Sequence, residues 1–364
     1  MGTIQAIGTA VPAYRHEQMK ILQFMQQVYA LNEQDKRKLS FLYHQSGIAY
    51  RYSVLPDYSR PAGEWKFYPN SENLEPVPTL EQRMQFFNRY APSLSVDAIR
   101  NCMDGKIRAE ELTHLITVSC TGLSAPGLDL QVLELLDLPR TISRTSVNFM
   151  GCYAAIHALK IADSICRSDT RARVMIVCTE LCTLHFQREP TTDNMTSSLL
   201  FGDGSAALLM TGDPAAKGLR LDSFYAEVVQ KGKKDMAWDL SSSGFQMTLS
   251  SYIPELIETD LSVITNNALN AMQLHSSAIH HWCIHPGGRR ILEATAKSLN
   301  LSKVALQNSY NTLKEYGNMS SATILFVLKN ILHQINRSEH RGERVFGAAF
   351  GPGLTVETFT ASAA

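Results

Sequence analysis

Three polar side chains in this sequence stand where an apolar run meets a turn of small residues: Cys152, His285 and Asn318. Each lies directly beside a glycine or a proline-glycine turn. The three supply a thiol, an imidazole and an amide. A site that combined them could form a covalent thioester and stabilise an enolate beside it.

The spacing around Cys152 predicts that its thiol lies at the N-terminus of a helix. Gly151 permits a tight turn after an apolar segment that ends at Met150, and residues 153–165 have helical spacing. The free amides and the positive end of the helix dipole stabilise a thiolate, so we expect a lowered pKa for this thiol. Because a glycine-cysteine pair often opens a helix, a structural cysteine is an open alternative to a nucleophile.

His285 and Asn318 each allow a catalytic and a structural interpretation. His285 ends a strand-like segment just before Pro286, at the kind of strand end where α/β proteins place their sites. A hydrogen-bonded, half-buried structural histidine is the alternative. Asn318 precedes a helix, where asparagine is a good N-cap, and its amide could also donate to a developing oxyanion. Taken singly, the cap is the favoured interpretation of Asn318.

The elements that must position these residues alternate along the chain. Apolar strand patterns are predicted at 4–11, 115–119, 173–179, 205–210, 220–229, 278–284, 345–349 and 354–359. Helical patterns are predicted at 17–29 and 80–101, in a segment that ends at 136, and at 153–165, 253–274, 289–299 and 318–335. The proline-rich range 56–78 is predicted to be a long surface loop. This alternation predicts an α/β fold with mixed sheets.

A weak internal repeat in the sequence suggests a duplicated fold. Gly151-Cys152 opens a predicted helix in the first half of the chain, and the segment 319–322 opens one in the second half. The best candidate for a boundary between two halves is the segment 213–218.

The composition of the chain excludes several classes of protein. The 364 residues are 45% hydrophobic and 19% charged, and 34 Lys+Arg balance 34 Asp+Glu. This balance argues against nucleic-acid and membrane-surface binding. The N-terminus does not resemble a signal peptide, and no apolar run reaches the roughly 18–20 residues of a membrane helix, so we expect a cytoplasmic protein. The seven cysteines are odd in number and lack metal spacing, which argues against a disulfide framework and a zinc site.

Five motifs, taken in their order, carry a resemblance to a known family. They are Gly151-Cys152 before a helix, Phe201-Gly202-Asp203-Gly204, Trp282-x-x-His285-Pro286-Gly287-Gly288, Tyr316-Gly317-Asn318-Met319-Ser320-Ser321-Ala322, and 347–357 with its Gly-Pro-Gly-Leu-Thr-Val-Glu core. The sequence resembles the chalcone synthase-like type III polyketide synthases of the thiolase superfamily, and in particular their bacterial branch. The resemblance covers the chain from about residue 110 to the end, and the N-terminal part more loosely. It implies a homodimer with a thiolase-like, duplicated αβαβα layered fold, in which residues 1–213 carry the nucleophile and 214–364 carry the histidine and asparagine.

The same resemblance implies a role for each of the three polar residues. Cys152 would take the starter acyl group from CoA, and His285 would support the thiolate and donate to the thioester carbonyl. Asn318, together with the histidine, would orient malonyl-CoA and stabilise the enolate. Loss of carbon dioxide generates the carbanion, so the reaction needs donors in a water-poor pocket and no metal or other cofactor. CoA thioesters are the implied substrates, and an acyl carrier protein is a further candidate donor.

Six residues are implied to bind substrate along the cavity wall: Phe201, Met247, Cys120, His185, Trp238 and Ser320. Phe201 matches an aromatic residue at the gate between CoA tunnel and cavity. Met247 stands where the plant enzymes carry a second phenylalanine, and a flexible methionine suits an adaptable apolar tunnel. Cys120 is interpreted as a wall residue rather than a nucleophile, with a buried strand residue as the alternative.

The implied CoA-binding residues depart from the plant pattern. Of the basic residues that this pattern places on a helix near 38–51, Lys38 is kept, while Phe41 and Gln45 occupy the other aligned positions. Arg289 and Arg290, after the Gly-Gly turn, are candidates to bind the CoA phosphates instead. A surface helix start is the alternative for this arginine pair.

The leading hypothesis is an acyltransferase that extends a fatty acyl-CoA starter with malonyl-CoA and cyclises the chain to an alkylpyrone or alkylresorcinol. A malonyl-primed tetrahydroxynaphthalene-type synthase and a β-ketoacyl-ACP synthase III are the nearest alternatives. A Cys-His hydrolase and a non-catalytic acyl-binding protein are more distant ones.

Overall fold

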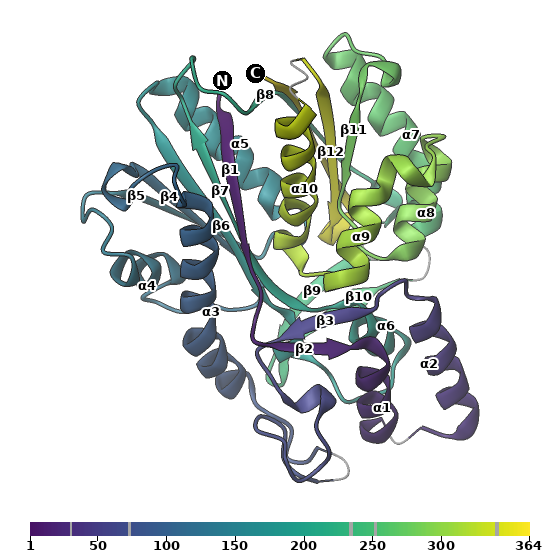
Figure 1. Ribbon diagram of the computed structural model, residues 1–364. Coiled ribbons are helices and arrows are strands. Elements are labelled where there is room, and N and C mark those ends of the chain that lie inside the picture. Colours follow the sequence, from purple (N-terminus) through teal and green to yellow (C-terminus); the bar gives the residue numbers. More distant parts are fainter. Residues whose placement is uncertain (30, 72–73, 233–235, 251–252, 339–341) are drawn as a thin grey trace.

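A nine-stranded mixed sheet runs through the molecule. The computed structural model describes residues 1–29, 31–71, 74–232, 236–250, 253–338 and 342–364. Within these residues the strand order is β11 (His281–Ile284), β12 (Arg344–Gly351), β13 (Thr355–Ala363), β8 (Leu219–Val228), β1 (Thr3–Ala10), β7 (Asp203–Thr211), β6 (Arg173–Leu181), β4 (His114–Ser119) and β5 (Ser143–Asn148) (Figure 1).

The two halves of this sheet repeat one pairing pattern. In the first half, β1 pairs antiparallel with β7, β7 antiparallel with β6, and β6 parallel with β4. In the second half, β8 pairs antiparallel with β13, β13 antiparallel with β12, and β12 parallel with β11. A short ladder between β1 and β8 joins the halves. The predicted duplicated α/β fold with mixed pairing is therefore confirmed.

Two helices form a central layer between the halves. They are α5 (Ala154–Ser168), which contacts β6 of the first half and β13 of the second, and α10 (Thr323–Ser338), which contacts β11 of the second half and β1 and β7 of the first. Both occupy matching places in the repeat, each just before the parallel strand β6 or β12 (Figure 1). The buried alanines of α5 explain how a helix fits between the two halves of the sheet, because small side chains allow close packing on both sides.

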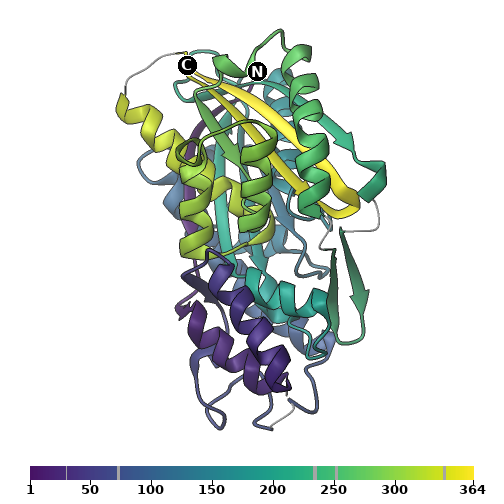
Figure 2. The ribbon, with the colours of Figure 1, turned by 90° about the vertical axis from the view of Figure 1, so that its right-hand side faces the viewer.

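Further helices cover the outer faces and one end of the molecule. They are α1 (Gln18–Val28), α2 (Glu33–Gln45), α3 (Leu80–Met103), α4 (Leu128–Leu135), α6 (Thr192–Leu200), α7 (Ile253–Ala271), α8 (Arg289–Ser298) and α9 (Gln307–Tyr316). Short 3-10 helices are η1 (Asp57–Ser59), η2 (Ala109–Glu111), η3 (Cys182–His185), η4 (Gln230–Gly232), η5 (Ser276–Ala278), η6 (Lys303–Leu306), η7 (Ser320–Ala322) and η8 (Pro352–Leu354). In both views α1 and α2 lie at the end of the molecule opposite the two chain termini (Figures 1 and 2).

Two small hairpins complete the fold. They are β2 (Tyr14–Glu17) with β3 (Tyr50–Ser53), and β9 (Met236–Ser241) with β10 (Gly244–Leu249). Figure 2 shows the β9–β10 hairpin projecting from the side of the molecule near α6. Neither hairpin nor the edge strand β5 was predicted. The reason is clearest for β5, in which only Val147 is buried, so the strand carries almost no apolar pattern.

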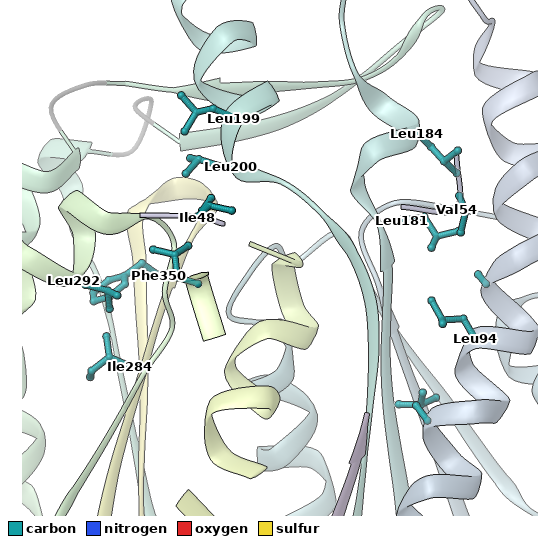
Figure 3. Close-up of a cluster of buried hydrophobic side chains, with 14 of the residues drawn as sticks. Ile48, Val54, Leu94, Leu181, Leu184, Leu199, Leu200, Ile284, Leu292 and Phe350 are labelled. Carbon is teal, nitrogen blue, oxygen red and sulfur yellow. The ribbon is translucent and has the colours of Figure 1, made fainter. Parts of the chain in front are cut away.

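One large apolar cluster lies where the end of α6 meets the second half of the chain. Figure 3 shows Leu200 near Ile48, and Phe350 with Leu292 and Ile284 below them. All five side chains are buried. This packing fixes the end of α6, from which Phe201 continues.

The predicted helices and strands are confirmed with shifted ends. The largest shifts are at α10, which begins at Thr323 because residues 320–322 form a 3-10 turn, and at β13, which continues to Ala363. In the part of the chain that the structure describes, no helix is both long and apolar enough to span a bilayer.

The interpretation of residues 56–78 as a surface loop is wrong in part, and residues 72–73 lie outside the described chain. Asp57 is fully buried, and its carboxylate accepts hydrogen bonds of 2.9 Å from the backbone amides of residues 66–68. Those bonds fold the segment inward, and its aromatic side chains pack around Phe24. Turn-forming residues indicate a loop but do not show whether the loop returns to the core.

Candidate active site

The structure brings the three chemically able residues to one cavity of about 460 Å³ between the two halves. The predicted residues that line this main cavity are Cys152, His285, Asn318, Cys120, Phe201, Trp238, Met247, Ser320, Arg289 and Arg290. Much of the remaining wall is apolar, with contributions from α2, α6 and α7. Ten of the twelve predicted site residues therefore meet in one place, although they come from segments far apart in the sequence.

Cys152 lies in the turn just before α5, as predicted. Gly151 adopts φ 80°, and a Cβ added there would lie 2.1 Å from the ring of Pro352, so the turn requires glycine. The Cys152 thiol lies 3.8 Å from the Ser320 hydroxyl. The two central helices therefore begin beside each other.

The expected lowering of the Cys152 pKa is wrong. The pKa of this thiol is raised to about 12, chiefly by burial and also by the nearby Glu180 carboxylate, against the contacts with Ser320 and Asn318, which lower it. The loss of hydration outweighs the stabilisation that the helix N-terminus supplies. With this pKa the residue is a neutral thiol near pH 7, so it needs a base to become a nucleophile.

The backbone of His285 is hydrogen-bonded to the neighbouring strand, whereas its imidazole ring makes no hydrogen bond to the described residues. Its amide donates to Ala348 O at 2.9 Å, which extends the β11–β12 pairing by one residue. The side chain is buried, and neither ring nitrogen has a hydrogen-bond partner within the described residues. Burial lowers the pKa of the imidazole to about 3, so the ring is neutral near pH 7. A hydrogen-bonded structural histidine is excluded, and both nitrogens remain available to a ligand.

The oxygen and the nitrogen of the Asn318 side-chain amide make different hydrogen bonds. The Oδ1 atom accepts from Ser320 N at 2.9 Å and from Thr323 Oγ1 at 3.4 Å, so it caps the turn that leads into α10. The Nδ2 atom donates to Gly287 O at 3.4 Å, and this amino group carries a second hydrogen. The capping interpretation made from the sequence is therefore confirmed, and the oxygen that caps leaves the amino group, on a residue that lines the cavity, with a hydrogen to spare.

His185 lies outside the main cavity, so its predicted place there is wrong. Its Nε2 lies 2.8 Å from Thr121 O, its Nδ1 accepts from Phe245 N at 3.1 Å, and its ring stacks on Phe245 with centroids 4.2 Å apart. It lines a smaller cavity of about 50 Å³. Four residues line both cavities and form the wall between them: Cys182, Phe201, Trp238 and Met247.

Lys38 also lies outside the main cavity. It is exposed and forms a 3.2 Å ion pair with Asp35 on the same helix. The mouth of the cavity is lined instead by Arg289 and Arg290 and by the exposed Phe41 of α2. The sequence could not reveal this, because Lys38 and Phe41 lie on one helix and their directions depend on how α2 packs.

A buried carboxylate lies beneath the site, on a residue that was not among the predicted site residues. Glu180, the penultimate residue of β6, accepts from Cys120 N at 2.9 Å, from Thr121 Oγ1 at 2.8 Å and from the Ser321 hydroxyl. Burial raises its pKa. These bonds tie the end of β4 to the start of η7. A lone acidic residue at the end of an apolar strand was the available signal.

Three buried histidines predict that the protein loses stability in mild acid. Burial lowers the pKa of His16 to about 4 and those of His185 and His285 to about 3, from an ordinary value of 6.5. Below pH 6.5 the unfolded chain binds protons at these sites and the native chain does not, so their contribution is lost as the pH falls from 6.5 toward 3. Asp203, with its pKa raised to about 6 by burial, and Glu180 act in the opposite sense.

These groups together take up one to two protons on unfolding near pH 5, since the three histidines each gain a proton while Asp203, with or without Glu180, loses one. The free energy of unfolding should therefore fall by about 1.4–2.8 kcal/mol per pH unit around pH 5. Urea denaturation at pH 7, 6 and 5 measures this slope. His16→Gln should reduce the slope by about 1.4 kcal/mol per pH unit. A free energy that stays constant or rises between pH 7 and pH 5 would contradict the prediction.

Two family models together match nearly the whole chain. The family model described as "Chalcone and stilbene synthases, N-terminal domain" matches residues 1–214, and "Chalcone and stilbene synthases, C-terminal domain" matches residues 220–363.

Individual relatives and solved structures agree. A Mycobacterium tuberculosis protein named "Alpha-pyrone synthesis polyketide synthase-like Pks18" is 32% identical over 77% of this chain and 72% of its own length. "Probable polyketide synthase 1" of Dictyostelium discoideum is 29% identical over 97% of this chain, which spans 11% of that protein. The crystal structure of PKS-I from the brown alga Ectocarpus siliculosus superposes with a TM-score of 0.93 at 27% identity, over 100% of this chain and 98% of that one.

Proposed function

Because this chain belongs to the chalcone and stilbene synthase family, the type III polyketide synthases, we propose that it loads an acyl-CoA starter on Cys152 and extends it by decarboxylative condensation with malonyl-CoA. Family membership makes the protein a malonyl-CoA-dependent acyltransferase with a thiolase-like fold. The finer proposal concerns the residues that act, the starter and the product. We take the halves to be residues 1–213, with the nucleophile, and 214–364, with the histidine and asparagine.

One observation carries this proposal. A neutral thiol, a neutral imidazole without hydrogen-bond partners among the described residues, and an amide whose amino group keeps a second hydrogen line the same largely apolar cavity. A buried imidazole that makes no structural hydrogen bond carries an uncompensated polar cost. A substrate that accepts a proton or a hydrogen bond from it removes that cost.

The loading step follows from these protonation states. The Cys152 Sγ attacks the thioester carbonyl of acyl-CoA, and its proton passes to the neutral His285. The tetrahedral intermediate collapses, the bond from the acyl carbon to the CoA sulfur breaks, and the CoA thiolate takes the proton from the imidazolium. His285 therefore acts as the base that the buried thiol needs.

The extension step uses the two donors. In malonyl-CoA the bond between Cα and the carboxylate breaks, carbon dioxide leaves, and the electron pair forms the enolate of acetyl-CoA. The N–H of His285 and the Nδ2–H of Asn318 donate to the enolate oxygen. The enolate carbon attacks the Cys152 thioester, so that a C–C bond forms and the C–S bond breaks. The thiolate of Cys152 is released and can accept the lengthened chain.

The main cavity supports a fatty acyl starter and an alkylpyrone or alkylresorcinol product. Its wall beyond Cys152 is formed by Met236, Trp238, Met247 and Leu249, which alternate along β9 and β10 and so share one face of the hairpin. Thioether and alkyl groups of this kind match an alkyl chain. The word "alpha-pyrone" in the name of the mycobacterial relative favours the same product class.

Arg289 and Arg290 are proposed to bind the CoA phosphates. They open α8, where the free backbone amides of the helix N-terminus add to the attraction for an anion. Arg289 forms a 2.7 Å ion pair with Glu293, and no ion pair is found for Arg290 within the described residues. If the proposal holds, Arg290→Ala should raise the KM for malonyl-CoA, and an unchanged KM would exclude this role.

A homodimer is proposed from the family and from the edge strand β5. This strand closes one side of the described sheet and is exposed along most of its length. Such an edge offers unpaired backbone groups to a second chain. A monomeric mass in sedimentation equilibrium at micromolar concentration would contradict the proposal.

The function is tested with a panel of acyl-CoAs of increasing chain length, each incubated with malonyl-CoA. We expect an acyl adduct on Cys152 and pyrone or resorcinol products that carry the starter. Products built from malonyl-CoA alone would identify a malonyl-primed synthase, and rapid release of free acid would identify a hydrolase. If neither an adduct nor carbon dioxide is detected, the protein is a non-catalytic acyl-binding protein. If activity requires an acyl carrier protein, the starter is delivered by that carrier and not by CoA.

Met247→Phe should shorten the longest starter that the enzyme accepts. Met247 pairs across the hairpin with Trp238 and lines both cavities, so a rigid ring there narrows the space for an alkyl chain. We expect kcat/KM for the longest accepted acyl-CoA to fall by about tenfold or more, with a smaller loss for the shortest one. Thr248→Val, on the opposite face of the same strand, is the control. An unchanged chain-length profile would remove Met247 from the wall that selects the starter.

A further inference from the structure

Arg51 of β3 is a buried cation without an ion pair among the described residues. The side chain is 4% exposed. Its Nη1 donates to Phe201 O at 2.6 Å, and its Nε donates to Gln18 Oε1 at 2.9 Å. Its two side-chain hydrogen bonds go to neutral oxygens, and the buried carboxyl of Asp203 favours the charged guanidinium from a distance beyond an ion pair. A buried charge held in this way is still costly, and an uncharged residue of similar volume would avoid that cost. We therefore ask what arginine supplies at this position that an uncharged residue of similar volume could not.

The carbonyl that Arg51 holds belongs to a backbone bridge that carries two site residues. Phe201 and Asn318 form a parallel β-bridge, in which Asn318 N donates to Leu200 O and Gly202 N donates to Asn318 O, both at 2.9 Å. This bridge connects the gate aromatic residue from the first half of the chain with the amide donor from the second half. Both residues line the main cavity.

The stem of Arg51 also packs against the two glycines of this bridge. A Cβ added to Gly317, which has φ +68°, would lie 2.7 Å from Leu200 O and 2.8 Å from Cγ of Arg51. A Cβ added to Gly202 would lie 2.9 Å from Tyr316 O and 3.5 Å from Cβ of Arg51. The bridge and the arginine are thus in close contact, and neither can shift without the other.

We propose that Arg51 is a positioning residue for the decarboxylation step, because it clamps the Phe201–Asn318 bridge and so fixes where the amide of Asn318 points in the cavity. This inference rests on the proposed role of Asn318. The planar fork of arginine donates to Phe201 O and Gln18 at once while its aliphatic stem fills the space beside the glycines. Lysine can supply the charge and one donor but not this fork.

The proposal separates the two half-reactions. Loading of Cys152 depends on His285 and the thiol, which Arg51 does not contact. Decarboxylation depends on the direction of the Nδ2–H of Asn318, and a small displacement of a donor weakens its effect on the transition state. Loss of the clamp should therefore slow carbon dioxide release much more than acyl loading.

The experiment measures both half-reactions in Arg51→Met and Arg51→Lys. Single-turnover acyl loading is followed by intact mass with a starter acyl-CoA, and carbon dioxide release is followed with malonyl-CoA alone. We expect Arg51→Met to slow decarboxylation at least about tenfold while loading changes less than about threefold, with Arg51→Lys intermediate. Gly317→Ala disturbs the same bridge from the other side and should give the same selective loss, which keeps the test valid if Arg51→Met fails to fold.

Arg83→Met is the matched control. Arg83 is similarly buried and also donates to backbone carbonyls, those of Pro78, Leu184 and Phe186, away from the bridge. Its replacement should lower thermal stability and keep the ratio of the two rates within about threefold of the wild type. If the Arg51 variants fold and the ratio of their decarboxylation and loading rates stays within about threefold of the wild type, Arg51 has a structural role alone and the inference is wrong.

Asn318→Ala in the same assay separates the inference from the proposed function. Loss of decarboxylation in Asn318→Ala, with wild-type decarboxylation in folded Arg51 variants, would overturn the inference and leave the proposed function intact. Wild-type decarboxylation in Asn318→Ala would overturn the role of Asn318 itself, and the inference with it.

Discussion

Cys152→Ala is expected to abolish polyketide formation while the protein still decarboxylates malonyl-CoA slowly. The variant has no nucleophile to hold the starter, so the rate of product formation should fall by at least about 10⁴-fold. His285 and Asn318 remain in the cavity, and their donors still stabilise the enolate that decarboxylation leaves. Product mass spectrometry measures the loss of polyketide, and carbon dioxide release from the same sample measures the remaining decarboxylation.

Cys166→Ala is the control for the loss of a buried thiol. Cys166 lies near the end of α5, the helix that Cys152 precedes, and is buried away from the cavity. We expect its activity to stay within about threefold of the wild type, with at most a modest loss of stability. Polyketide formation by Cys152→Ala would show that the nucleophile lies elsewhere, and Cys120 and Cys182, which line the same cavity, would then be tested first.

Asn318→Ala is expected to suppress decarboxylation by about 10²–10³-fold, the usual effect of removing one donor to an oxyanion. Acyl loading on Cys152 should continue, because the imidazole that accepts the thiol proton is unchanged. The alanine variant also loses the cap to Ser320 N, which costs about 0.5–2 kcal/mol of stability. The variant alone therefore mixes a catalytic effect with a structural one.

Asn318→Asp separates these effects. Aspartate keeps an oxygen that can accept from Ser320 N and Thr323 Oγ1, and it caps helices as well as asparagine does. It has no amide hydrogens, and its charge opposes an enolate. We expect wild-type thermal stability with decarboxylation lost at least as fully as in Asn318→Ala. Decarboxylation within about tenfold of the wild type in Asn318→Asp would limit Asn318 to its capping role.

The fold could be predicted where burial leaves a periodic pattern in the sequence. Strands β6 and β7 are buried along nearly their whole length and appear as apolar runs, and α3 and α10 show helical spacing over many residues. The edge strand β5 and the hairpin β9–β10 are mostly unburied, so their sequences carry no comparable signal. The missed hairpin matters most, since it supplies Trp238 and Met247 to the cavity wall.

The sequence by itself determined the chemical groups of the site, because each stands at a junction that is visible locally. Cys152 before a helix, His285 at a strand end and Asn318 before a helical turn are all placed by their immediate neighbours. Their order along the chain, together with the conspicuous glycines beside them, was enough to indicate the family. None of these features requires knowledge of a distant contact.

The tertiary structure alone decided the electrostatics and the walls of the site. The pKa of Cys152 is raised rather than lowered, because burial and Glu180, from another strand, outweigh the helix end that is visible in the sequence. His185 lies behind the wall and Lys38 outside the mouth, because the packing of whole elements sets where their side chains point. Arg51 reaches the bridge that holds Asn318 across 267 positions of sequence (318 minus 51). Desolvation and long-range contact are properties of the folded chain, and no local pattern encodes them.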